Sequence, residues 1–236
     1  MHQQMFFGSI SSGKPPITFE FTASHNVVAE ATSLTDSSAA LGTAAENRQI
    51  LVMTESGRSS GSGTSLVSGV TCGGDAMTEL VQVNRTGGNP YRSCSAMYIL
   101  AVPTGTAADI VVTWSDTQYN TWIHTVAVYG AASSAHDTGG THGQGAGLVL
   151  SDTLNIPALG CAFASTSGSS GDLSNYAWVG LTEQTGTYSS ELTIGSGRSG
   201  YAADTDMSAE TGRTIQSTST GSQNDATFCC ISLAQA

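Results

Sequence analysis

The amino-acid sequence predicts an all-β fold, a single jelly-roll-like antiparallel β-sandwich with a short N-terminal arm and long polar loops. Blocks of five to nine β-branched and aromatic residues are closed by Gly, Ser and Asn, as strands are closed by turns. The blocks follow one another at a spacing near ten residues, which is typical of sandwiches. No long segment carries the 3.6-residue apolar period of an amphipathic helix.

Residues 1–16 are expected to form an arm that docks on a partner. Phe6 and Phe7 precede a Gly/Ser segment and then Pro15 and Pro16, which favour an extended backbone. Apolar residues on a loose arm need a surface to pack on, so these four are candidate partner-docking residues. Residues 17–236 are expected to form one sandwich domain, because all-β domains of this length are often single units.

The first strands alternate between two faces. Ile17, Phe19 and Phe21 share one face, whereas Thr18 and Glu20 share the other. Separate strands are expected at 17–23, 26–32, 48–55, 65–72, 76–83, 95–102, 109–116 and 121–130.

Glycines and polar stretches set the remaining boundaries. Gly73-Gly74 predicts a tight hairpin, because glycine readily adopts the positive φ that such turns require. Residues 131–147 and 196–225 are expected to be long polar loops. Further strands are expected at 147–152, 158–165, 175–183, 188–195 and 226–234, the last closing a sheet beside an early strand, as in jelly rolls.

The charge balance excludes some partners. Seven basic and eighteen acidic residues give a formal charge of −11, which disfavours nucleic acid and anionic membranes. No segment approaches the ~20 apolar residues that span a bilayer. The first residues do not resemble a secretory signal, so synthesis in a cytoplasm is expected. Charged residues are 11% of the chain, so hydroxyls, glycine and amides are expected to dominate its surface.

Five cysteines, an odd number without CxxC spacing, predict buried free thiols rather than a zinc site or a disulfide framework. Cys229 and Cys230 are neighbours in one strand, so they point to opposite faces. One of them is therefore a candidate for an intermolecular bond.

No catalytic or metal site is expected, and no cofactor. Residues 57–61 match G-x-S-x-G around Ser59, but a nucleophile elbow needs a following helix. His136, Asp137 and His142 lie in the expected loop 131–147, which offers a metal no rigid support. Asp204, Asp206 and Glu210 lack the glycine and remaining ligands of a calcium loop. His25 and His124 are expected to be packed or surface histidines.

Two tyrosines are the better candidates for contact with a carbohydrate. Tyr119 lies in the segment DTQYN, which is expected to be a turn, and Tyr91 lies in GGNPYRS. Exposed aromatic faces with polar neighbours are what saccharide sites use. Most other aromatic residues lie within expected strands, where core packing is their role.

Four elements resemble those of a β-sandwich domain of tailed-bacteriophage virion proteins. They are Asn47-Arg48 at the start of a strand, the Gly73-Gly74 hairpin, the turn Pro103-Thr104-Gly105-Thr106 and the late apolar strand ATFCCISLA. The resemblance covers residues 47–131 and the last strand, and its motifs are structural turns.

The resemblance implies a non-enzymatic virion protein, made in the host cytoplasm. Its implied role is a decoration or cement protein on the capsid surface, with the major capsid protein or tail proteins as partners and with several copies associating. The alternatives are a tail fibre or baseplate component that contacts host carbohydrate, and a carbohydrate-binding module.

Overall fold

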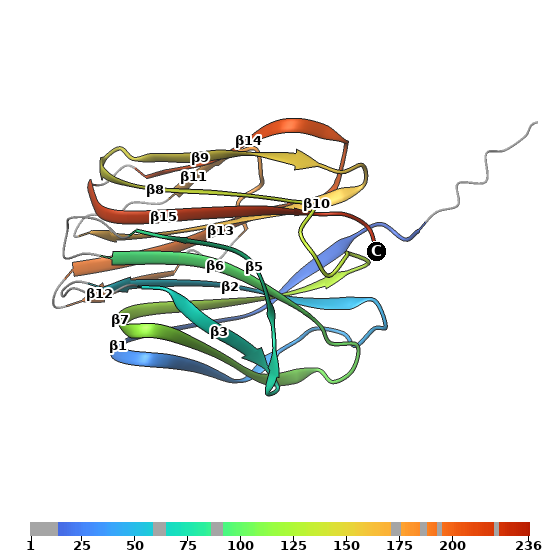
Figure 1. Ribbon diagram of the computed structural model, residues 1–236, viewed down its shortest axis with the longest axis horizontal. Coiled ribbons are helices and arrows are strands. Elements are labelled where there is room, and N and C mark those ends of the chain that lie inside the picture. Colours follow the sequence, from blue (N-terminus) through green and yellow to red (C-terminus); the bar gives the residue numbers. More distant parts are fainter. Residues whose placement is uncertain are drawn as a thin grey trace, which may run out of the picture.

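The computed structural model describes residues 14–58, 65–85, 92–170, 176–184, 188–192, 195–219 and 222–236. These residues form fifteen strands, whose ladders are all antiparallel. The predicted all-β antiparallel sandwich is therefore confirmed. The strands belong to three sheets, stacked in layers (Figure 1). The described part contains no helix of the length and apolarity that crossing a bilayer requires.

The first sheet has seven strands, in the order β4-β3-β7-β2-β6-β5, and β1 pairs with β7. Its strands are β1 (Thr18–Ala40), β2 (Arg48–Arg58), β3 (Val67–Cys72), β4 (Asp75–Ala76), β5 (Thr78–Asn84), β6 (Arg92–Ala101) and β7 (Ala107–Tyr129).

This sheet folds back on itself. The first half of β7 pairs with β3 and the second half with β2, while β1 follows β7 through several register shifts. Such irregularities let long strands bend. The Gln82 amide on β5 then bridges to Val67 on β3, with its Oε1 2.7 Å from Val67 N and its Nε2 3.3 Å from Val67 O. Gln82 thus links two strands that lie far apart in the order of the sheet.

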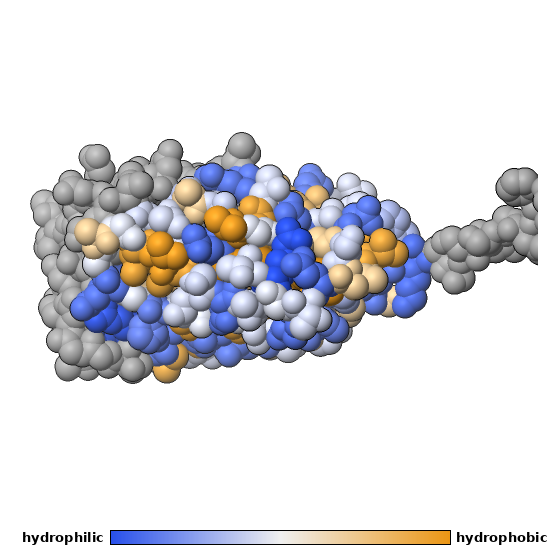
Figure 2. All heavy atoms as spheres, turned by 90° about the horizontal axis from the view of Figure 1, so that it is seen from above, coloured by the Kyte–Doolittle hydropathy of each residue, from blue (hydrophilic) through white to orange (hydrophobic). Residues whose placement is uncertain are grey.

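The second sheet has the order β12-β13-β10-β15-β8 and the third has the order β11-β14-β9. Figure 2 looks onto the side of the molecule where the third sheet lies. The strands are β8 (Asp137–Ala146), β9 (Val149–Ile156), β10 (Gly160–Ser170), β11 (Tyr176–Val179), β12 (Tyr188–Leu192), β13 (Gly195–Met207), β14 (Glu210–Ser219) and β15 (Ser222–Leu233).

Period-two alternation along single strands builds three hydrophobic cores. Ile50 of β2 points into the first core, inside the folded first sheet, and Leu51 points into the second core, between the first and second sheets. On β15, Cys229 points into the second core and Cys230 into the third, between the second and third sheets. Each central strand therefore serves two cores, as alternate Cβ directions require.

Arg48 joins two of the motifs that the sequence singled out. Its guanidinium is fully buried and donates to five carbonyl oxygens at 2.7–3.0 Å. The acceptors are Leu41, Gly42, Val102, Thr104 and Gly105. Arg48, the first residue of β2, thus fixes the turn at 103–106 and the loop after β1. Its guanidinium holds several donors in one rigid plane, whereas a lysine has a single nitrogen.

The glycine hairpin is confirmed, but several boundaries are wrong. Gly73 and Gly74 have φ of 61° and 93° and connect β3 to β4. The expected breaks at 24–25 and 117–120 do not exist, because β1 and β7 are continuous strands of 23 residues.

The expected polar loops are wrong too: 131–147 contains β8, and 196–225 contains most of β13 and all of β14. The small residues of these strands allow neighbouring sheets to approach closely. A side chain at Gly140 would collide with Val83 and with the Phe228 carbonyl. The last strand, β15, lies between β10 and β8 rather than beside an early strand, so the jelly-roll detail is not confirmed.

Candidate functional site

The space between the first and second sheets is apolar in one half and polar in the other. Along β2 the inward residues Leu51 and Met53 are followed by Glu55, and along β10 Phe163 is followed by Ser165. The same change occurs on β6, β7, β13 and β15, where the polar members are Ser95, His124, Ser199 and Thr227. The sequence places these groups together because antiparallel strands align their inward positions at one height.

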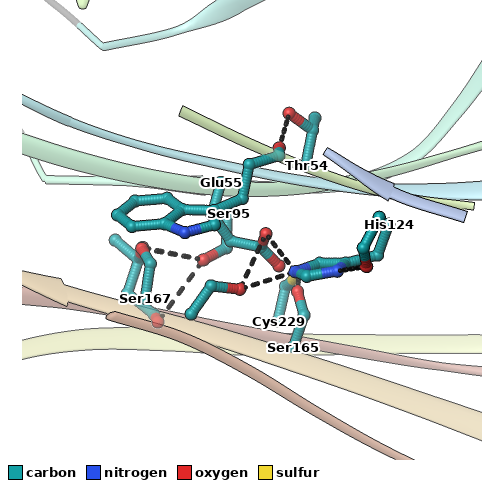
Figure 3. A network of polar contacts seen from close by, with 11 residues as sticks. Thr54, Glu55, Ser95, His124, Ser165, Ser167 and Cys229 are labelled. Atoms are coloured by element: carbon teal, nitrogen blue, oxygen red, sulfur yellow. Dashed lines mark hydrogen bonds and ion pairs between the residues drawn. The ribbon is translucent and has the colours of Figure 1, made fainter. Parts of the chain in front are cut away.

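Glu55 and His124 are the centre of this polar half (Figure 3). His124 Nε2 lies 3.5 Å from Glu55 Oε2 and 2.8 Å from Ser199 Oγ, which in turn donates to Glu55 Oε2 at 3.1 Å. On the other side of the ring, Ser24 Oγ lies 2.7 Å from His124 Nδ1. The result is a continuous chain of polar contacts from β1 through β7 and β13 to β2.

A second group of hydroxyls ties the same two sheets together. Ser95 Oγ on β6 lies 2.9 Å from Thr227 Oγ1 on β15, which lies 3.1 Å from Ser167 Oγ on β10. Ser165 Oγ lies 3.4 Å from Cys229 Sγ. These groups are buried, so their hydrogen bonds offset the cost of removing them from water.

Burial also sets the protonation states. Desolvation raises the pKa of Glu55, although hydrogen bonds from Ser165 and Ser199 lower it in part. Desolvation lowers the pKa of His124. Both shifts favour the uncharged form, which is a neutral carboxylic acid beside a neutral imidazole.

The Glu55–His124 network is not accessible to an outside molecule. Glu55 and Ser199 are fully buried, His124 is 1% exposed, and among the four linked residues only Ser24 is partly exposed. A general base must reach the proton that it takes from a substrate. The network therefore fits a structural role, as expected for a packed His124.

The root of the N-terminal arm lies beside the C-terminus (Figure 1). Pro15 and Pro16 are exposed, and the next residue, Ile17, is 1% exposed in the second core. Gln235 Nε2 donates to Pro15 O at 3.1 Å. Phe6 and Phe7 lie outside the described residues. Ile17 is thus the first core residue after the two prolines.

The two candidate carbohydrate residues do not form a described site. Tyr119 lies within β7 and is only half-exposed, so its expected place in an exposed turn is wrong. Tyr91 lies outside the described residues, as does Ser59 of the G-x-S-x-G match.

The candidate metal ligands do not form a cluster in the described part of the chain. His136 and His142 are exposed, and Asp137 accepts a hydrogen bond from Asn155 N at 2.7 Å. Asp204 accepts one from Thr182 N at 3.1 Å. Within the described ranges, no three His, Cys, Asp or Glu residues are placed to hold a metal ion.

The five cysteines are free and buried, as expected. Cys229 and Cys230 do point to opposite faces, but each face is covered by another sheet and both side chains are fully buried. The candidate intermolecular bond is therefore wrong for the folded chain. Burial raises the pKa of both thiols, which keeps them protonated and unreactive.

Sequence reasoning treated His124 as a packed or surface residue and missed its pairing with Glu55. The available signal was the alternation along β2. Glu55 is two residues after Met53 and four after Leu51, so it shares their inward face. Comparisons with protein-family models, with curated proteins and with solved structures find no match for this chain.

Proposed function

We propose that this chain is a non-enzymatic structural protein of a virion, a decoration protein that binds the capsid surface through residues 1–16. The observation that carries the proposal is where the core of the described fold begins. Pro15 and Pro16 are exposed, and Ile17 is the first residue of the core, so Phe6 and Phe7 precede the core in the sequence. A segment with two neighbouring phenylalanines before the first core residue is suited to pack on another protein.

Two further features support a structural role. Two of the four motifs of the virion-protein resemblance are in contact, because Arg48 binds the carbonyls of Thr104 and Gly105. The most chemically suggestive group, Glu55 with His124, is sealed between two sheets. A capsid or tail protein is accordingly the proposed partner, with no role proposed for a cofactor, nucleic acid or membrane.

The first experiment locates the chain on particles. Virion preparations are labelled with an antibody against this chain and viewed by electron microscopy. Label spread over the head supports the proposal. Label confined to the tail replaces it with the tail fibre or baseplate alternative, and absence of the chain from every virion fraction contradicts both.

The second experiment tests the arm. Particles lacking the protein are mixed with the full chain, with a chain lacking residues 1–14, or with a full chain carrying Phe6→Ser and Phe7→Ser. We expect both variants to lose binding by at least tenfold while keeping the circular dichroism of the sandwich. The matched control replaces Ser11 and Ser12 by Ala and is expected to bind fully. Full binding by the truncated chain would refute the role of the arm.

A further inference from the structure

Two neighbouring rows of residues cross β2 and β7 in the polar half of the space between the first and second sheets. In one row Glu55 lies opposite Trp122, and in the next row Gly57 lies opposite Asn120. Residues two apart in a strand share a face, so both rows point towards the second sheet, as Glu55 does. The three side chains are buried, with Glu55 0%, Trp122 2% and Asn120 5% exposed.

Each of these three side chains has one buried polar atom without a hydrogen-bond partner in the described chain. The atoms are Glu55 Oε1, Trp122 Nε1 and Asn120 Oδ1. Native proteins leave few buried polar atoms unpaired, and those without a protein partner are commonly paired with an ordered water. The indole nitrogen can only donate, whereas the amide oxygen can only accept. The three atoms thus offer both kinds of partner that a water molecule needs.

Gly57 leaves room between these groups. A Cβ atom at Gly57 would lie 3.8 Å from Asn120 Cβ and 4.0 Å from Arg92 O, which are ordinary contacts. Neither neighbour occupies the position of the missing side chain. Ser93 of β6 lies opposite Gly57 on its other side, so the row consists of a serine, a glycine and an asparagine. The centre of this polar row has space for a group as small as a water molecule.

We propose that Glu55, Trp122 and Asn120 bind an internal water molecule beside Gly57. The water accepts a hydrogen bond from Trp122 Nε1 and donates one to Asn120 Oδ1. Its third contact is with Glu55 Oε1, and an uncharged carboxyl group can donate or accept there. One water thereby offsets the cost of removing three polar groups from bulk solvent.

The water site lies where the ladder between β2 and β7 ends. Gly57 and Asn120 are the last pair of this ladder. A water that binds Glu55 on β2 and Asn120 on β7 holds the two strands together at that point. It also extends the polar network of Figure 3 from Glu55 to the end of the ladder.

A high-resolution crystal structure of the purified chain tests the site directly and does not depend on the virion proposal. We expect an electron-density peak for a water within about 3.2 Å of Trp122 Nε1 and of Asn120 Oδ1 or Glu55 Oε1. A direct hydrogen bond from Trp122 Nε1 to either of the other two side chains would overturn the proposal. So would a structure without a water peak beside Gly57.

A second experiment detects the water in solution and displaces it. Gly57→Ala places a methyl group at the proposed position, and Gly57 does not have the positive φ that disfavours alanine. The matched control is Gly69→Ala on β3, where a Cβ atom would meet nothing within 4 Å. Circular dichroism checks that both variants fold.

The readout is magnetisation transfer from water to the indole hydrogen of Trp122 in nitrogen-15-labelled protein. The sign of the rotating-frame signal separates a bound water from direct exchange of the hydrogen, and Trp122→Phe identifies the resonance. We expect transfer from a bound water in the wild type and in Gly69→Ala, and loss of most of it in Gly57→Ala. No such transfer in the wild type, equal transfer in Gly57→Ala, or an equal loss in Gly69→Ala contradicts the site.

Discussion

Replacing Glu55 by Gln should remove a pH dependence of stability that this one side chain creates. Burial raises the pKa of Glu55 from 4.5 to about 8. The folded chain therefore holds this proton more tightly than the unfolded chain does. The stabilisation is fully present below pH 4.5 and is lost as the pH rises through the folded pKa.

The neighbouring imidazole has the opposite sign. Burial lowers the pKa of His124 from 6.5 to about 3, so its contribution is lost as the pH falls below 6.5. The two effects oppose each other between pH 4.5 and 6.5. Burial raises the pKa of Asp225 from 3.8 to about 6, so this residue changes the stability mainly below pH 6.5. The window from pH 6.5 to 8 thus isolates Glu55.

In that window one proton differs between the two states, and each pH unit costs about 1.4 kcal/mol. We expect the free energy of unfolding to fall by about 2 kcal/mol in the wild type and to stay nearly constant in Glu55→Gln. Urea unfolding at several pH values, followed by tryptophan fluorescence, to which the buried Trp114 and Trp122 contribute, measures this difference.

The exposed Glu30 provides the control, because Glu30→Gln makes the same chemical change and should follow the wild type. If the wild type and Glu55→Gln have parallel curves from pH 6.5 to 8, then Glu55 is already ionised beside His124. The neutral pair would then be wrong.

Two other predictions concern buried polar groups. Arg48→Met keeps the aliphatic packing but leaves five carbonyl oxygens without the guanidinium, so we expect a loss of at least about 3 kcal/mol in urea unfolding at pH 6; a loss under about 1 kcal/mol would contradict the role given to Arg48. Ellman's reagent should modify none of the five cysteines in native buffer and all five in denaturant, and a thiol that reacts rapidly in the native protein would contradict their burial.

The sequence predicted the strands that alternate clearly, and it missed those that lack bulky residues. The alternation of Phe19 and Phe21 predicts a strand, and Gly73-Gly74 predicts a tight turn. Both features depend only on local sequence. β8, by contrast, is rich in glycine because neighbouring layers approach closely at Gly140, and composition alone reads such a segment as a loop. The continuity of β1 and β7 depends on their mutual pairing, which no local pattern encodes.

The polar site was predictable only in part. Opposite directions for Cys229 and Cys230 follow from strand geometry, but their burial follows from the sheets on either side. The sequence does show that Glu55 lies on the same face of its strand as Leu51 and Met53. The contact between Glu55 and His124 depends on the register of β2 and β7, in which Met53 pairs with His124. The contact between Glu55 and Ser199 depends on how the second sheet packs on the first.

The pairing of β1 with β7 also determines when the chain can fold during its synthesis. Thr18 pairs with Tyr129, roughly 110 residues later, and β7 is the only strand partner of β1 in the described chain. At about 5–20 residues per second, β1 waits roughly 5–20 s for its partner to leave the ribosome. Phe19 and Phe21 stay exposed to water during that interval, so the yield of folded protein in a cell depends on how well this first strand is kept from aggregating.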